Sequence, residues 1–251
     1  MKRLYIISIL ILNTVCLYAQ DAMTLAHKGD DHYRNGEYTE AIECYEQVLS
    51  IGMTSAELHY NLAGAYYRNN QIGMAILNYE RALRIQPSMK DAKENLTLAE
   101  SRTIDNISPV PQFFFARWYN ALCHAMPPAT WRIIWIVLLS LLCISFIVFQ
   151  AGHSIKTKKT SLICGTISLL LLLFASTLLL STTHKYNAHS EAIIIDPTIT
   201  VKSSPENNSV DKLLLHEGTK VTILDELNGW YKIRIADGTT GWCDLQTIER
   251  I

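Results

Sequence analysis

The segment YRNGEYTEAIECYEQVLSI, residues 33–51, recurs 34 positions later as YRNNQIGMAILNYERALRI, residues 67–85. Comparing residues 22–55 with residues 56–89 at this offset gives ten identical pairs, nine of them inside the two quoted segments. The same offset also pairs Asn61 with Asn95. Self-similarity at a fixed period is typical of a repeat architecture, in which each unit buries its apolar face against the next. These residues therefore predict a stack of helical repeats.

A period of 34 residues is that of the tetratricopeptide repeat, and this segment resembles that family. Small Ala41 and Ala75 would let the two helices of a unit approach closely, while Asn35-Gly36 and Asn69-Asn70 would supply the turns, where positive φ is tolerated. We expect two full units plus a capping helix, over residues 21–104. The positions that carry the resemblance are Gly29, Ala41, Tyr45, Leu62, Tyr66, Ala75, Tyr79, Ala82 and Pro87.

Such repeats serve either as a peptide-binding groove or as a small helical spacer. Paired arginine and tyrosine are typical of binding hot spots. The resemblance also implies that the lysine and asparagine with which some relatives clamp a C-terminal carboxylate are replaced here by Ala26 and Asp30, which disfavours that ligand class. The residues expected on the concave, protein-binding face are Tyr33, Arg34, Tyr60, Asn61, Tyr67 and Arg68.

The charges are segregated along the chain, although the formal net charge of the 251 residues is only -1. Residues 20–105 carry 13 acids and 8 bases, and residues 184–251 carry 10 acids and 7 bases. No acid stands between Asp105 and Glu191. The lack of a basic excess argues against nucleic-acid binding, and two acidic ends around an apolar middle argue against a single soluble globule.

Two uncharged, apolar runs are expected to be transmembrane helices, residues 133–155 and 160–183. Residues 156–159 between them, with Lys156, Lys158 and Lys159, are expected to form a basic cytoplasmic loop under the positive-inside rule. Residues 1–19 have the layout of a secretory signal peptide, with an uncleaved anchor as the alternative. Both signals predict an inner-membrane, multi-pass protein whose N- and C-terminal domains are periplasmic.

The linker over residues 105–132 concentrates aromatic side chains just ahead of the first apolar run. It contains three consecutive phenylalanines at 113–115, then Trp118 and Tyr119, with Arg117 and Arg132 nearby. Aromatics and arginines at this level favour an interfacial helix on the membrane surface. A helix that binds a partner protein is the alternative.

Residues 192–251 change to β-branched and aromatic runs separated by hairpin signals such as Asn228-Gly229 and Asp237-Gly238. Five short strands closing into a barrel are expected, at 193–195, 200–201, 220–227, 230–235 and 248–251. The motifs His216-Glu217-Gly218, Gly229-Trp230-Tyr231 and Gly241-Trp242 resemble the bacterial SH3 domain. That resemblance implies a ligand-binding groove at Trp230, Tyr231 and Trp242; alternatively, Trp230 packs into the barrel and Trp242 caps it.

Motifs of catalysis and cofactor binding are missing from the sequence: it has no Gly-rich phosphate loop, no HExxH and no GxSxG. The six cysteines form no CxxC pair, so a zinc site is not indicated, and we expect them to be structural. The prediction is therefore a non-enzyme without catalytic residues, cofactor or metal. The fold class is a multidomain membrane protein: an all-α tetratricopeptide repeat, a two-helix transmembrane hairpin and an all-β SH3-like barrel.

The order of these segments resembles the BatE family of the Bacteroides aerotolerance operon. The resemblance implies partners among Bat-type von Willebrand factor A proteins, indirectly a MoxR-class ATPase, and a role in envelope stress or oxygen tolerance. We expect a non-enzymatic adaptor or scaffold that presents two binding modules at the membrane. The alternative is a cell-wall anchor that binds peptidoglycan, or a peptide, through the SH3 domain, with the repeats as a spacer.

Overall fold

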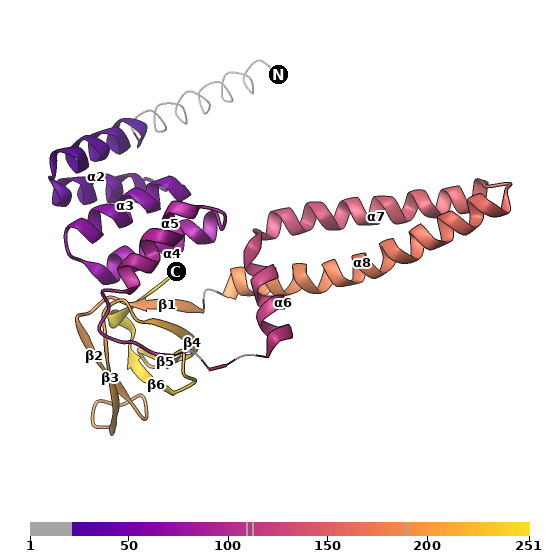
Figure 1. Cartoon of the computed structure of the whole chain (residues 1–251). Helices are drawn as coiled ribbons and strands as arrows, with labels where there is room; N and C mark the ends of the chain where they lie inside the picture. Colours follow the sequence, from indigo (N-terminus) through magenta and orange to yellow (C-terminus); the bar gives the residue numbers. More distant parts are fainter. Residues whose placement is uncertain (1–21, 109, 112, 189) are drawn as a thin grey trace, which may run out of the picture. The chain divides into compact units, whose positions relative to one another are not determined.

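The computed structural model describes residues 22–108, 110–111, 113–188 and 190–251 (Figure 1). The expected signal peptide, residues 1–19, lies outside the described residues. The chain divides into two compact units. The first joins the chain up to Val110 with Ser190–Ile251, and the second is Pro111–His189. The first unit is thus built from two segments that are far apart in the sequence.

The repeat segment of the first unit is entirely helical. A helix over residues 22–35, without a label in Figure 1, is followed by α2 (Tyr38–Ser50), α3 (Ala56–Arg68), α4 (Ile72–Ile85) and α5 (Lys90–Glu100). The two predicted turns are confirmed, because Gly36 and Asn70 have φ of 82° and 63°. Ser55 caps α3 by accepting a hydrogen bond from the Leu58 amide at 3.0 Å.

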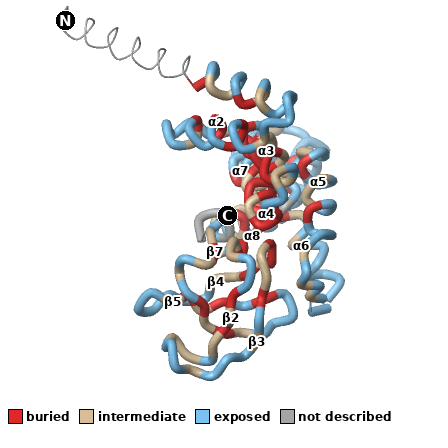
Figure 2. The backbone as a smooth tube through the Cα atoms, turned by 90° about the vertical axis from the view of Figure 1, so that its left-hand side faces the viewer, coloured by how far each residue is buried: buried red, intermediate tan, exposed pale blue. Residues whose placement is uncertain are grey.

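Small residues allow the repeat helices to pack closely, as the sequence predicts. Ala41 and Ala75 are fully buried, and buried positions follow the inner faces of the helices (Figure 2). A Cβ at Gly29 would lie only 2.7 Å from Cε1 of Tyr45, so the helix over residues 22–35 can approach α2 only with a glycine there. The tyrosine and the glycine form one packing unit.

The residues after position 190 form a seven-stranded antiparallel sheet in the order β3-β2-β6-β5-β4-β1-β7. The strands are β1 (Glu191–Ile194), β2 (Thr198–Lys202), β3 (Asp211–His216), β4 (Lys220–Leu227), β5 (Trp230–Arg234), β6 (Thr240–Asp244) and β7 (Ile248–Arg250), with a 3₁₀ turn at Leu245–Thr247. The expected five strands were too few, since β3 and β6 were not predicted. Closure into a barrel stays a prediction.

Each strand that the sequence did not reveal departs from a regular strand pattern. β3 reads DKLLLH, whose three successive leucines do not alternate with polar residues. β6 contains Gly241, which reads as a turn signal. The glycine has a packing reason, because a Cβ at Gly241 would lie 2.3 Å from Cγ1 of Val201 on the neighbouring strand β2.

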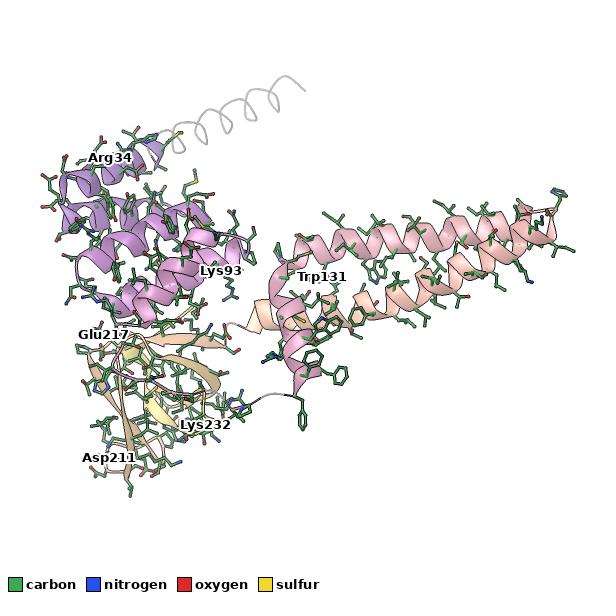
Figure 3. All side chains as sticks on the ribbon, viewed as in Figure 1. Arg34, Lys93, Trp131, Asp211, Glu217 and Lys232 are labelled. Atoms are coloured by element: carbon green, nitrogen blue, oxygen red, sulfur yellow. The ribbon has the colours of Figure 1, made fainter. Side chains whose placement is uncertain are left out.

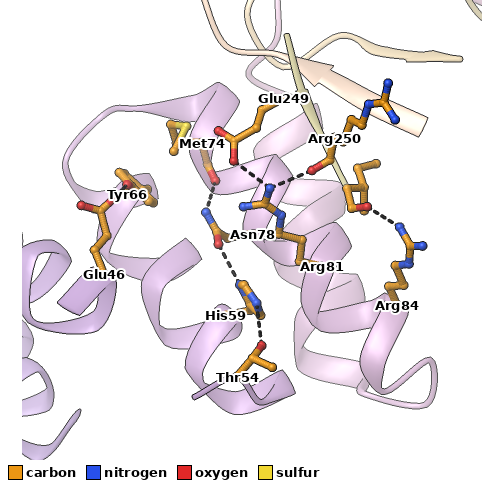
Figure 4. A network of polar contacts seen from close by, with 11 residues as sticks. Glu46, Thr54, His59, Tyr66, Met74, Asn78, Arg81, Arg84, Glu249 and Arg250 are labelled. Carbon is orange, nitrogen blue, oxygen red and sulfur yellow. Dashed lines mark hydrogen bonds and ion pairs between the residues drawn. The ribbon is translucent and has the colours of Figure 1, made fainter. Parts of the chain in front are cut away.

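The repeats and the sheet meet in one interface, which we call the seam: it comprises α4, Asp105, and β1, β4, β7 and the β3–β4 turn. Lys220 pairs with Glu80 of α4 at 2.8 Å and with Glu191 at 3.1 Å. Arg81 pairs with Glu249 at 2.7 Å (Figure 4). Ile193 and Ile251 join the buried apolar cluster of the repeats. The two modules therefore share part of one core.

The second unit contains α6 (Phe114–Ala125), α7 (Pro128–Ala151) and α8 (Ile155–Ala188). Within the described part of the chain, α7 and residues Ile155–His184 of α8 are long and apolar enough to cross a membrane. The two helices run antiparallel: Trp135 Nε1 donates to Ser176 Oγ, and Ser168 Oγ donates to the Leu138 carbonyl, both at 2.9 Å.

The limits of these helices differ from the expected ones. Residues 156–159, expected as a loop, lie in the first turns of α8, and residues 152–154 make the connection. Ser154 explains the early start, because its hydroxyl accepts from the Lys156 amide at 3.3 Å and its carbonyl accepts from the Lys158 amide at 3.1 Å. α7 begins at Pro128 rather than at residue 133, since proline suits the first turn of a helix.

Candidate peptide-binding groove and sheet face

A groove of about 470 Å³ runs along the repeats. The structure brings together all six residues expected on the concave face, and they come from the helix over residues 22–35 and from α3. Tyr45, Tyr79 and α5 complete the lining, which reaches the capping helix. The lining residues are Asp30, Tyr33, Arg34, Tyr45, Tyr60, Asn61, Gly64, Tyr67, Arg68, Tyr79, Asn95 and Leu98.

Tyrosine rings form the walls of this groove. Tyr60 packs against Tyr79 with the ring centroids 5.9 Å apart, and the Tyr60 hydroxyl accepts a hydrogen bond from Asn95 Nδ2 at 3.1 Å. Burial raises the pKa of Tyr60, with Asp91 adding to the effect, and burial likewise raises the pKa of Tyr79. These phenols therefore stay neutral at physiological pH and combine a broad apolar face with a polar tip.

Asp30 is the one acidic residue among the lining residues. Its Oδ1 accepts hydrogen bonds from the Tyr45 hydroxyl at 2.7 Å and from Asn61 Nδ2 at 3.2 Å. Burial raises the pKa of Tyr45, and the bond to Asp30 raises it further. A carboxylate held in this position repels a ligand carboxylate. This repulsion is consistent with the sequence, which disfavours ligands bound through a C-terminal carboxylate.

Arg34 and Arg68 stand at the rim. Arg34 is labelled in Figure 3; its Nη1 lies 3.1 Å from Asp31 Oδ1, and both side chains are exposed. Arg68 donates from Nε to the Tyr38 hydroxyl at 3.1 Å, and its guanidinium carbon lies 5.3 Å from the centre of the Tyr38 ring. A cation over an aromatic face is attracted to it, so the ring holds Arg68 in place while its charge is kept.

The structure brings two of the three expected SH3 groove residues to one face of the sheet. Trp242 lies opposite Lys232, and Trp230 is next but one to Lys232 on the same strand, so all three share a face. Both tryptophans are half-buried, and Lys232 Nζ lies 5.9 Å from the ring of Trp242 (Figure 3). Tyr231 points to the opposite side, into the apolar core, where Arg250 donates to its hydroxyl at 3.2 Å.

Among the described residues, no group of three histidine, cysteine or acidic side chains is placed to hold a metal ion. Cys44, Cys123 and Cys243 are buried thiols. Burial raises the pKa of Cys243 to about 11, which makes it a poor nucleophile at neutral pH.

Three family models match the chain. Residues 29–70 match a model described as TPR repeat, and residues 56–89 match one described as tetratricopeptide repeat. Residues 201–249 match a bacterial SH3 domain. The chain therefore contains tetratricopeptide repeats and a bacterial SH3 domain, the two modules that the sequence predicts.

Three curated relatives each match about 30% of the chain. RNA polymerase II-associated protein 3 of Rattus norvegicus is 31% identical over 74 residues, which is 30% of this chain and 11% of the relative. The probable serine/threonine-protein kinase BSK3 of Oryza sativa subsp. japonica is 30% identical over 29% of this chain and 15% of its own length. The inactive TPR repeat-containing thioredoxin TTL3 of Arabidopsis thaliana is 32% identical over 29% and 10%. The chain thus spans only a small part of these relatives.

One similar solved structure is the first TPR of Spaghetti (RPAP3) bound to the HSP90 peptide SRMEEVD. It is 22% identical, covers 33% of this chain and 92% of the solved chain, and has a TM-score of 0.22.

Six lining residues of the groove were not among those expected: Asp30, Tyr45, Gly64, Tyr79, Asn95 and Leu98. The period of 34 could have located Asn95, because it is the equivalent of Asn61 one repeat later. Tyr45 and Tyr79 were expected as positions that carry the resemblance to the repeat family. The structure shows that they pack and also face the groove.

Proposed function

We propose that this protein is a non-enzymatic, membrane-anchored adaptor whose repeats bind an extended segment of a partner protein. The observation that carries the proposal is the groove itself: six residues chosen for their concave position line one tyrosine-walled channel. Tyrosine and arginine supply large contact area and directional donors, which is the composition of binding hot spots. The SH3 domain offers a second surface at Trp230 and Trp242.

Anchoring is proposed through α7 and α8. The two helices are antiparallel, so the start of α7 and the end of α8 come to the same end of the pair, and Lys156, Lys158 and Lys159 lie at the other end. Under the positive-inside rule the lysine end is cytoplasmic, which puts the repeats and the SH3 domain in the periplasm of a bacterial inner membrane. A phosphatase fusion at Lys158 that is active outside the cytoplasm would reverse this topology.

We further propose that α6 lies along the outer membrane surface. Phe113, Phe114 and Phe115 are 88%, 66% and 79% exposed, an unusual number of bare aromatic rings for one short segment. The helix is tied to the apolar pair, because Trp118 stacks on Phe174 at 6.2 Å and the Tyr119 hydroxyl donates to the Thr177 carbonyl at 2.9 Å. Aromatic side chains next to the end of a membrane-spanning helix prefer the lipid headgroup region.

The partners proposed are inner-membrane proteins of the Bat type, the von Willebrand factor A proteins that the order of segments suggests, and through them a MoxR-class ATPase. Tethering in a shared membrane raises the effective concentration of each binding module for such partners. The test is affinity purification of the full-length protein from solubilised membranes, followed by mass spectrometry. Retention of the same partners after Tyr33→Ala and Arg68→Ala would refute binding through the groove.

A cell-wall anchor is the second candidate, and the shared face of Trp230 and Trp242 favours it. Aromatic side chains beside Lys232 suit a glycopeptide as well as a peptide. The discriminating experiment is sedimentation with purified peptidoglycan sacculi. If Trp230→Ala and Trp242→Ala abolish sedimentation while groove variants keep every protein partner, the anchor replaces the adaptor.

A further inference from the structure

We infer that the groove carries a row of three arginines along its rim, Arg34, Arg68 and Arg102, and that this row selects a partner segment with acidic side chains. The inference rests on the proposed binding function of the groove and specifies the chemistry of its ligand. Arg102 belongs to neither the expected site nor the residues matched by the repeat models, which end at residue 89. The row also differs from the clamp positions, which Ala26 and Asp30 occupy.

Periodicity and structure both place the three residues in one line. Arg68 follows Arg34 by 34 positions, and Arg102 follows Arg68 by 34 positions. Arg34 and Arg68 line the groove. The Arg102 guanidinium carbon lies 5.1 Å from the centre of the ring of Tyr67, which is itself a lining residue. The row therefore extends from the groove lining to Arg102, which lies just beyond the end of α5.

The row keeps its positive charge, because neutral groups hold two of its members. Arg68 is held by the ring and hydroxyl of Tyr38. Arg102 is held by the Tyr67 ring, and its Nη2 donates to Asn70 Oδ1 at 3.1 Å. Both arginines are exposed, and each keeps nitrogen donors that these contacts do not use.

Arg34 differs in having an acidic partner. It pairs with Asp31, but the two side chains are 73% and 71% exposed. An ion pair in such an exposed position is weak and readily exchanged for another carboxylate. A guanidinium that is already positioned by a ring or a side chain loses less conformational entropy when it binds a carboxylate of the ligand.

The floor of the groove limits where the acidic groups of the ligand can lie. Asp30 already engages Tyr45 and Asn61 there, so a ligand carboxylate is repelled from the floor and confined to the rim. Helices in direct contact lie about 8–10 Å apart, and an extended chain advances about 3.3 Å per residue. Acidic residues at roughly every third position would then match successive arginines.

The experiment is selection of a displayed library of random twelve-residue peptides on the full-length protein in lipid nanodiscs, with empty nanodiscs as the counter-selection. The enriched peptides are then synthesised, and their dissociation constants are measured at low and high salt for the wild type and for variants. The expected result is enrichment of aspartate and glutamate, with binding that weakens as salt rises.

The variants separate the row from the groove. Arg68→Ala and Arg102→Ala are each expected to weaken binding by about fivefold, the range of exposed, partly screened charges, and Arg102→Lys by less. Lys28→Ala is the matched control, since this exposed cation lies on the same helix as Arg34 but about half a turn away from Asp30. It is expected to change nothing. Circular dichroism of each variant checks that the helices are intact.

Two results overturn the inference, and they have different meanings. Enriched peptides that are not acidic, or that bind Arg102→Ala as tightly as the wild type but lose affinity with Tyr33→Ala, refute the arginine row and leave the groove standing. No enrichment over empty nanodiscs refutes both the row and the proposed function.

Discussion

Asp105 offers the sharpest test of the seam between the repeats and the SH3 sheet. Its two carboxylate oxygens accept hydrogen bonds from the His216 amide at 2.7 Å, from His216 Nδ1 at 2.8 Å and from Thr219 Oγ1 at 2.7 Å. The Asp105 side chain is only 12% exposed. Substitution Asp105→Ala removes the acceptor for all three donors at once, and each donor comes from a segment more than a hundred residues away.

The size of the effect follows from these contacts. A hydrogen bond to a charged group contributes roughly 1.5–3 kcal/mol, and three bonds to one carboxylate are not additive, so we expect a loss of about 2–4 kcal/mol. For a unit of this size 1 kcal/mol shifts the melting temperature by about 2–4 °C. The variant should therefore melt about 4–16 °C below the wild type.

The effect should also depend on pH. Burial tends to raise the pKa of Asp105, but the hydrogen bonds from His216 and Thr219 outweigh it and hold the pKa below its ordinary value. A group with a depressed folded-state pKa contributes stability above its unfolded pKa of about 4, and that stability is lost as pH falls through the folded pKa. The gap between wild type and Asp105→Ala should narrow below about pH 4.

The assay is differential scanning calorimetry of the full-length protein in detergent. We expect the repeats and the sheet to unfold in one transition. Asp211→Ala is the matched control, because this aspartate of the same sheet pairs with Lys202 at 2.9 Å while its own side chain is 67% exposed. It should lower the melting temperature by little, as exposed pairs contribute roughly 0–1 kcal/mol. Equal melting temperatures for wild type and Asp105→Ala, or separate transitions for repeats and sheet in the wild type, would refute a shared folding unit.

Three further outcomes follow from particular contacts. Gly29→Ala should destabilise the repeats by about 1–3 kcal/mol, because the new Cβ would meet Tyr45 at 2.7 Å; chemical denaturation measures this, and unchanged stability contradicts the close packing. Lys220→Met should destabilise the seam by roughly 1–3 kcal/mol, since Glu80 and Glu191 lose their partner. If the double variant Lys220→Met with Glu80→Leu is no more stable than Lys220→Met alone, the lost ion pair is not the cause of the destabilisation. Cys243, with its pKa of about 11, should resist iodoacetamide at pH 8 until the sheet unfolds; rapid modification of the native protein would show that the thiol is accessible.

Local patterns predicted the parts of the fold that depend on neighbouring residues. The offset of 34 located the repeat helices and their turns because every unit packs against the next with the same small and large residues at equivalent positions. β4, Lys220–Leu227, has the predicted limits because the hairpin signal Asn228-Gly229 follows it directly; both residues have positive φ. The same periodicity placed Tyr33 and Tyr67 among the residues expected to line one groove, and both do line it.

Contacts between distant segments could not be predicted in this way. Nothing near Asp105 in the sequence indicates that it binds His216, because the partner lies 111 residues away. Tyr231 was grouped with Trp230 as an expected groove residue, yet neighbouring residues on a strand point to opposite faces. Which of the two faces the core depends on the sheet packed around them, which a short motif does not specify.

The seam also has a consequence for how the protein is made. Glu217 accepts a hydrogen bond from the Gly73 amide, and the two residues are separated by 144 positions that include both apolar helices. During synthesis α4 is complete long before its covering strands exist, so Ile193 and Ile251 can reach the repeat core only after α8 has been translated. Until then, the repeats expose an apolar surface that chaperones can bind. The first unit can therefore be completed only after both apolar helices, α7 and α8, have been synthesised. A chain whose synthesis stops before the strands are made has an incomplete core, which proteases can recognise.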